Sequence, residues 1–144
     1  MVDRDLIIAK AGSIQKHLKR IAAKSDVDIN SFLSDVDRQE VISFNLHLVI
    51  ENCIDIAAHI ISEEGYGMPG SASDMFYLLE ENSFVDRKLT EKMVKAVGLR
   101  NLIVHEYAKV DLGRLYQIVQ KDIGDIKDFL AAVFRKLGIS TQST

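Results

Sequence analysis

The chain has 144 residues, of which 47% are hydrophobic and 27% charged, and its formal net charge is −3. This length fits one domain with a proper core, and the composition is ordinary for a soluble globular protein. The negative net charge argues against a general nucleic-acid binder, although it leaves room for a local basic cleft. No apolar run approaches the roughly 20 residues that span a membrane, which predicts no membrane association.

The cysteine content and the N-terminal residues favour a cytoplasmic protein. Cys53 is the only cysteine, so no internal disulfide can form, which suits a reducing compartment. The first five residues lack the basic region and apolar stretch of a secretory signal.

In the first half of the chain, hydrophobic residues recur at alternating steps of four and three, which is typical of amphipathic helices. This spacing predicts a first helix over residues 3–24. A second, long helix is predicted from about Asp35 to Glu64, with Asn30 and Ser31 as candidate caps in the polar link before it. The long helix is apolar over a wide arc, so we expect more than one neighbour to cover it.

The second half continues the helical pattern after a glycine-rich loop over residues 65–71. Ser73 is predicted to cap a short third helix, and a fourth begins after Val85 and runs into the segment at Arg100. The last helix is predicted from Asp111 to about Leu137. We therefore predict an all-α antiparallel bundle of about five helices, with one domain over residues 1–138 and a frayed tail over 139–144.

The most informative segment is Arg100-Asn101-Leu102-Ile103-Val104-His105-Glu106-Tyr107. On a continuous helix, Arg100 and His105 would lie about 140° apart around the axis and about 7.5 Å apart along it. Asn101 and His105 would share one face, and Arg100 and Tyr107 the neighbouring face. The Arg100 side chain would then have to reach around the helix, or a second subunit would have to bring its own copy alongside.

These residue types suit cleavage of RNA by transesterification. Arginine can fork onto a phosphate, and histidine exchanges protons near neutral pH. His105 would move a proton from the ribose 2′-hydroxyl or to the leaving oxygen, and Arg100 would neutralise charge on the phosphate, without a divalent metal. Asn101 would orient the phosphate or fix the imidazole tautomer. The alternative is an ordinary helix end, because an arginine and a histidine five residues apart are common by chance.

The segment resembles the signature of HEPN-domain ribonucleases, and the tyrosine at the second position after the histidine makes it similar to the HepT branch of that family. The resemblance extends from about Val41 to Asp111 in order and spacing, over Asp55–Ile61, the loop around Pro69, Phe76, Leu79, Met93 and Val110-Asp111. It implies a HEPN-like helical fold, a homodimer, and catalytic roles for Arg100 and His105, with Asn101 at the polar position after the arginine.

The same resemblance implies a toxin paired with a small nucleotidyltransferase antitoxin of the MntA type. In that branch the antitoxin transfers AMP from ATP to a tyrosine, which corresponds here to Tyr107. An adenylylated Tyr107 would place bulk and negative charge beside Arg100 and repel RNA. The alternative for Tyr107 is an amphipathic residue packed at a helix end.

A polar stripe on the predicted long helix allows other interpretations of the sequence. His47, Glu51, Asp55 and His59 recur every four residues, but a stripe of this spacing drifts about 40° per step and does not converge on a metal. A solvated or interfacial polar face fits better, with Glu51 and Asp55 as candidates to face the cleft of Arg100 and orient a basic group. No metal or cofactor is expected. The functional alternatives are a non-catalytic helical module that binds a nucleotidyltransferase, or a metal-binding helical bundle.

Overall fold

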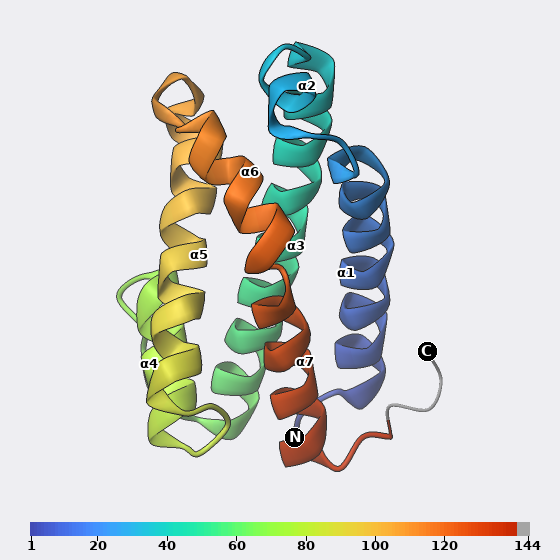
Figure 1. The fold of residues 1–144 in the computed structure, drawn as a ribbon. Coiled ribbons are helices and arrows are strands. Elements are labelled where there is room, and N and C mark those ends of the chain that lie inside the picture. Colours follow the sequence, from blue (N-terminus) through green and yellow to red (C-terminus); the bar gives the residue numbers. More distant parts are fainter. Residues whose placement is uncertain (141–144) are drawn as a thin grey trace.

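The computed structural model describes residues 1–140, and all regular structure within them is helical (Figure 1). The elements are α1 (Arg4–Ser25), α2 (Ile29–Leu33), α3 (Val36–Glu64), α4 (Ala72–Glu81), α5 (Arg87–His105), the 3₁₀ turn η1 (Tyr107–Lys109), α6 (Leu112–Lys121) and α7 (Gly124–Leu137). The predicted all-α bundle is confirmed. The predicted number of about five helices is wrong for the described residues, which contain seven α-helices.

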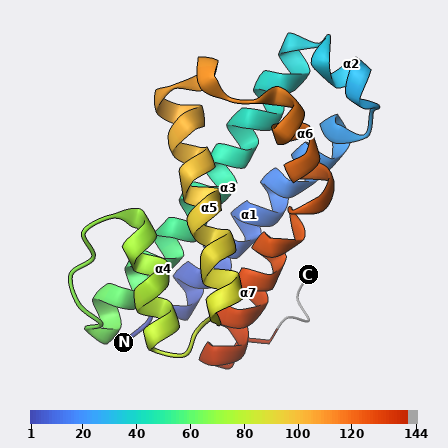
Figure 2. The same cartoon turned by 60° about the vertical axis from the view of Figure 1, so that its left-hand side comes forward.

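Helix α3 is the centre of the bundle. It packs along α1 on one side and against α4 and α5 on the other, while α6 and α7 cross in front of it (Figures 1 and 2). By length and composition α3 could cross a membrane, but 56% of its most apolar stretch is buried inside the domain. This is the expected state of the core helix of a soluble protein, covered by several neighbours.

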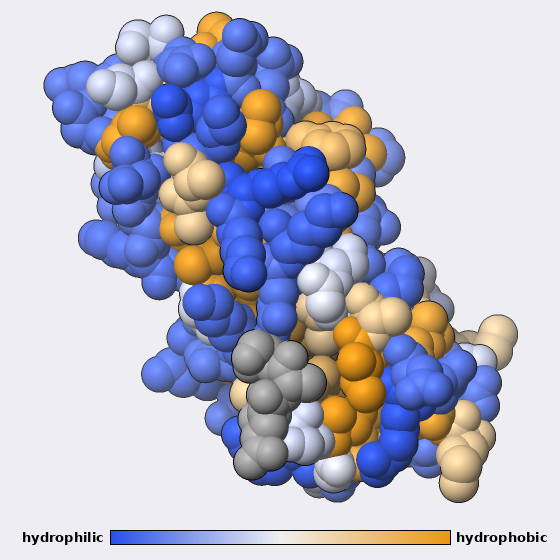
Figure 3. Space-filling view, turned by 90° about the vertical axis from the view of Figure 1, so that its right-hand side faces the viewer, coloured by the Kyte–Doolittle hydropathy of each residue, from blue (hydrophilic) through white to orange (hydrophobic). Residues whose placement is uncertain are grey.

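The outer face of the bundle is polar where α1 meets solvent. Figure 3 shows this side of the molecule as largely hydrophilic, with hydrophobic residues in separate patches and in a wider area in its lower half. The buried residues of α1 follow the predicted stripe: Ile7, Ala11, Ile14, Leu18 and Ile21. Cys53 on α3 is fully buried, and this burial raises the pKa of its thiol well above the usual range, as expected for an inert core cysteine.

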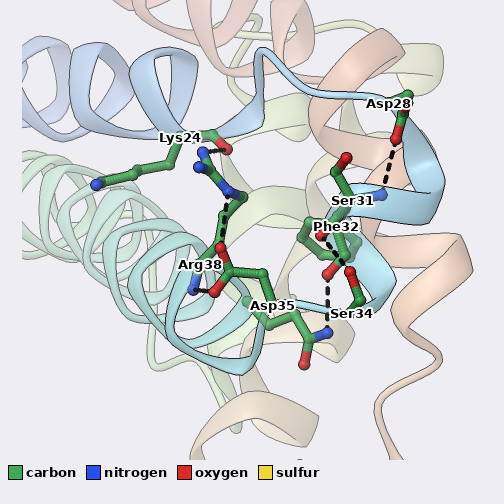
Figure 4. Close-up of polar contacts among 8 residues, drawn as sticks. Lys24, Asp28, Ser31, Phe32, Ser34, Asp35 and Arg38 are labelled. Atoms are coloured by element: carbon green, nitrogen blue, oxygen red, sulfur yellow. Dashed lines mark hydrogen bonds and ion pairs between the residues drawn. The ribbon is translucent and has the colours of Figure 1, made fainter.

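Aspartates, rather than the predicted Asn30 and Ser31, cap the helices after α1. Ser31 donates its backbone N–H to Asp28 over 2.7 Å, and Arg38 donates its backbone N–H to Asp35 over 3.0 Å (Figure 4). Asn30 and Ser31 lie inside α2, a short helix that the sequence pattern did not reveal. Aspartate is the stronger cap at these positions because its carboxylate offers a charged acceptor to the positive end of each helix.

This capping has a measurable consequence in acid. The hydrogen bonds from Ser31 lower the pKa of Asp28, so the carboxylate stabilises the fold above its unfolded pKa and loses that contribution as the pH falls through the folded pKa. We expect the free energy of unfolding to decline as the pH drops below about 4. In Asp28→Asn that decline should be smaller than in the wild type, measured by urea titration from pH 6 to pH 3. Asp128→Asn, on the exposed face of α7, should keep the wild-type decline; equal slopes for all three proteins would refute the assignment.

The predicted cap of the third helix is displaced by two residues. Asp74 donates its backbone N–H to the hydroxyl of Ser71 over 3.2 Å, and Ser73 lies within α4. Ser71 takes this role because it is extended, with φ of −158° and ψ of 170°, whereas Ser73 is already helical.

The predicted last helix over 111–137 is divided into α6 and α7. Asp122 occupies the position where the apolar stripe after Val119 would continue, and Gly124 follows it. A charge cannot be buried there without a partner, and glycine weakens a helix interior. Helix α6 therefore leans toward α1 and α2, with Tyr116 donating its hydroxyl proton to the carbonyl of Val27 over 2.6 Å.

The first residue of the predicted frayed tail, Ile139, is ordered against the bundle. Ile139 donates its backbone N–H to the carbonyl of Phe134 over 2.8 Å, and its side chain packs against the core. Gly138 stops α7 in the left-handed conformation, as the sequence predicts. Residue 139 is therefore held in place, and residues 141–144 of the predicted tail lie outside the described residues.

Candidate functional site

Helix α5 delivers Arg100 to the central helix. Asp86 caps the start of α5, and its buried residues Thr90, Met93 and Val97 follow each other at steps of three and four. Arg100 is the next position of this stripe, so its side chain is directed to α3 and is only 16% exposed. Local helical periodicity alone is therefore enough to bring the guanidinium into the inter-helix contact.

Glu51 receives the guanidinium of Arg100. Arg100 Nε lies 3.0 Å from Glu51 Oε1, which makes an ion pair. The N–H is not aimed at this oxygen, and Nε is buried without a hydrogen bond among the described residues. The contact is electrostatic, and water screens it in part, because the Glu51 side chain is 37% exposed although Arg100 Nε is buried.

Glu51 and Asp55 pair with different neighbours. Glu51 Oε1 also lies 3.8 Å from His47 Nε2. Asp55 instead pairs with Lys10 of α1 over 2.9 Å and faces away from Arg100. The expectation that Asp55 faces the cleft is therefore corrected: four residues along α3 amount to about 40° of rotation, enough to turn the side chain to a different neighbour.

His105 and Asn101 lie on the other side of α5. His105 is the last residue of the helix, and both side chains are exposed. Within residues 1–140, neither forms a side-chain hydrogen bond or ion pair, and no such contact joins Arg100 to His105. A single chain thus presents the two groups in different directions, as the helical geometry predicts.

Tyr107 follows the end of α5 and returns to α3. Glu106, with φ of −145° and ψ of 52°, ends the helix, and Tyr107 begins η1. Its half-buried ring packs against the core, and its hydroxyl oxygen accepts a hydrogen bond from Ser43 over 3.4 Å. Arg100 and Tyr107 therefore face the same helix, although the continuous helix assumed from the sequence ends between them.

A shallow groove of about 280 Å³ lies between α3 and the end of α5. Its walls combine apolar and polar side chains: Glu40, Ser43, Phe44, His47, Ile103, Val104 and Tyr107. Sequence reasoning missed Ser43 and assigned His47 only to a solvated or interfacial face. The available signal was their spacing, because Ser43, His47 and Glu51 recur every four residues on the side of α3 that meets α5.

Few positive charges are free around this groove. The charge of Arg100 is offset by Glu51, and Lys109 pairs with Glu106 over 2.9 Å. Glu40 adds a further carboxylate to the wall. No three His, Cys, Asp or Glu side chains of the described chain converge into a cluster that could hold a metal ion.

Two solved structures of toxin–antitoxin complexes contain chains with the same fold. A toxin–antitoxin complex with AMP-PNP contains a chain that is 34% identical, with a TM-score of 0.86, over 91% of this chain and 98% of that chain. A tri-AMPylated HEPN toxin of Shewanella oneidensis in complex with its MNT antitoxin is 34% identical, with a TM-score of 0.85, over 91% and 98% of the two chains. The fold and the segment around Arg100 thus define a HEPN-type helical domain.

The family described as "Ribonuclease HepT-like" matches residues 14–133, and the chain belongs to this family. The mRNA nuclease HepT of Shewanella oneidensis is 35% identical over 90% of this chain and 96% of its own length. The tRNA nuclease HepT of Aphanizomenon flos-aquae is 26% identical over 75% of this chain and 71% of its own length. The resemblance drawn from the residues is confirmed.

Proposed function

We propose that the chain is a cytoplasmic, metal-independent endoribonuclease toxin that acts through Arg100 and His105. The observation that carries the proposal is the placement of an arginine at the contact of α5 with α3, five residues before an exposed histidine, in a member of a ribonuclease family. The proposed substrate is RNA, because the similar proteins of Shewanella oneidensis and Aphanizomenon flos-aquae are an mRNA nuclease and a tRNA nuclease.

In the proposed reaction, an imidazole accepts the proton of the 2′-hydroxyl, and the 2′-oxygen attacks the adjacent phosphorus. The bond from phosphorus to the 5′-oxygen breaks, and a separate protonated group acts as the acid that gives a proton to that oxygen. The products are a 2′,3′-cyclic phosphate and a 5′-hydroxyl. Arg100 stabilises the charge on the phosphate as it becomes pentacoordinate, and Asn101 orients the phosphate or the imidazole.

The proposed reaction needs a second copy of the chain. One chain turns Arg100 and His105 in different directions and offers few free cations, so a two-fold related partner would supply the complementary groups. Exposed apolar residues beside the groove support this arrangement. Phe44 is 58% exposed and Val104 45% exposed, and Leu33, Val36 and Val41 on α2 and α3 add to the same end of the molecule.

The proposed control is transfer of AMP to Tyr107 by a nucleotidyltransferase antitoxin of the MntA type. Support comes from the relatives, which include an AMPylated HEPN toxin bound to an MNT antitoxin. Tyr107 has the chemistry for this role, since it lines the groove and its phenol oxygen makes a single hydrogen bond within the described residues, accepted from Ser43. A phosphate there would lie in the same groove as His47 and add negative charge where RNA must bind.

Product analysis in the presence of EDTA tests the nuclease proposal. We expect purified protein to cleave RNA at an unchanged rate in EDTA and to leave 2′,3′-cyclic phosphate and 5′-hydroxyl ends. Mass spectrometry of a short RNA identifies both ends. A rate abolished by EDTA, or products with 5′-phosphates, would contradict the mechanism.

The second candidate is a non-catalytic module that binds a nucleotidyltransferase. The ion pair of Arg100 with Glu51 favours it, because this pair offsets the charge that a phosphate would need. Such a module would bind its partner tightly, leave RNA intact and have no effect on growth when expressed alone. A toxin should arrest growth under the same conditions.

A further inference from the structure

We propose that His47 is an RNA-binding residue of this site, and that it hydrogen-bonds the phosphate next to the one held by Arg100. This inference rests on the proposed nuclease function and adds a substrate contact to it. His47 belongs to α3, outside the Arg100–Tyr107 segment, and its place in the groove comes from the packing of α3 against α5.

The antiparallel packing of α3 and α5 fixes the position of His47. Glu51 contacts Arg100 at one end of the contact, and Ser43 contacts Tyr107 at the other. His47 lies midway between Ser43 and Glu51, on the same side of α3, with Ile103 and Val104 in the groove wall beside it. A strand of RNA that runs from Arg100 toward Tyr107 therefore passes the imidazole, about 6 Å along α3 from the position of Glu51.

The imidazole is available for a ligand. Its side chain is 25% exposed, and Nε2 lies 3.8 Å from Glu51, too far for a hydrogen bond. Among the described residues it makes no hydrogen bond of its own, whereas His17 bonds to Asn45 over 2.8 Å and His59 accepts the backbone N–H of Asp3 over 2.8 Å. His47 differs from these two structural histidines because it lines the open groove and makes no hydrogen bond within the described residues.

Neighbouring side chains hold the ring in place and set its ligand. Phe44 approaches the ring edge-on, with 6.3 Å between centroids, and so limits its rotation. At 3.8 Å the carboxylate of Glu51 does not accept a hydrogen bond from His47, so a phosphate oxygen in the groove is the acceptor that would satisfy the N–H of the imidazole. The same position lies within the groove that an AMP group on Tyr107 would fill. Modification would therefore remove this contact.

RNA binding measured without cleavage tests the role of His47. The parent protein is His105→Ala, and the probe is a fluorescein-labelled single-stranded RNA followed by anisotropy. Adding His47→Leu, which keeps bulk but has no donor, should raise the Kd about tenfold. Adding His47→Gln, which keeps an N–H donor, should change the Kd by less than about threefold, because the lost interaction is a hydrogen bond and not packing. His59→Leu, on the same helix, should leave the Kd unchanged.

The outcomes separate this inference from the nuclease proposal. Thermal unfolding confirms that each variant is folded. Equal affinity of the leucine variant and its parent, or equal weakening by leucine and glutamine, overturns the role of His47 even if the wild type cleaves RNA. If the wild type does not cleave RNA but the leucine variant still binds about tenfold more weakly than its parent, and the glutamine variant less than about threefold more weakly, the nuclease proposal fails and the role of His47 stands.

Discussion

Replacement of Arg100 by alanine is expected to lower the rate of RNA cleavage by about 10²–10³-fold, because one donor to the charged phosphate is lost. His105→Ala is expected to cost about 10²–10⁴-fold, through loss of proton transfer. Both are measured as single-turnover rates on a labelled RNA. The two losses should not add in the double variant, because the groups act on one phosphate.

Several controls distinguish chemistry from folding in this experiment. Arg100→Lys keeps the ion pair with Glu51 but loses the planar fork, so it should cleave faster than the alanine variant and slower than the wild type. Arg114→Ala, at an exposed position of α6, should cleave at the wild-type rate. Cleavage that survives both Arg100→Ala and His105→Ala in folded protein would refute the site.

Mixing the two inactive variants tests whether each site is built from residues of two subunits. If Arg100 of one subunit acts with His105 of its partner, then exchange of subunits between Arg100→Ala and His105→Ala assembles some sites with both groups intact. Activity should then reappear in the mixture. Silence of a mixture whose subunits are shown to exchange would overturn a site built across two chains.

Tyr107→Phe is expected to abolish AMP transfer and with it the neutralisation of toxicity. The substitution removes one oxygen, keeps the ring that packs on the core and loses only the hydrogen bond from Ser43. Purified nucleotidyltransferase and ATP should add the mass of AMP to the wild type and nothing to the variant. In cells, the variant should arrest growth even when the partner is present.

A second tyrosine provides the matched control for this prediction. Tyr77→Phe removes a hydroxyl from an exposed position on α4, where the ring contacts Arg87, and should accept AMP at Tyr107 as the wild type does. An AMP adduct on Tyr107→Phe, or neutralisation of that variant by the partner, would contradict the assignment. Either result would leave the cleavage prediction for Arg100 and His105 unaffected.

The amino-acid sequence by itself determined the helical class, the extents of α1 and α3, the start of α5, and the membership of the family. Each of these follows from local features: apolar residues at steps of three and four, glycine at Gly65 and Gly138, and the Arg100–Tyr107 segment. The direction of Arg100 is also local, because it continues the buried stripe of α5. Short-range periodicity is sufficient for such features, since it depends on residues within one or two turns.

The tertiary structure decided which neighbours those side chains meet. The division of α6 from α7 follows from a charge at Asp122 and from the surfaces that α1 and α2 offer to α6, and no periodicity encodes that second partner. The pairing of Glu51 with Arg100, of Asp55 with Lys10 and of Ser43 with Tyr107 depends on how α3 is rotated against two helices at once. That rotation is set by packing of the whole core. The partner of each side chain on α3 therefore depends on residues that are distant in the sequence.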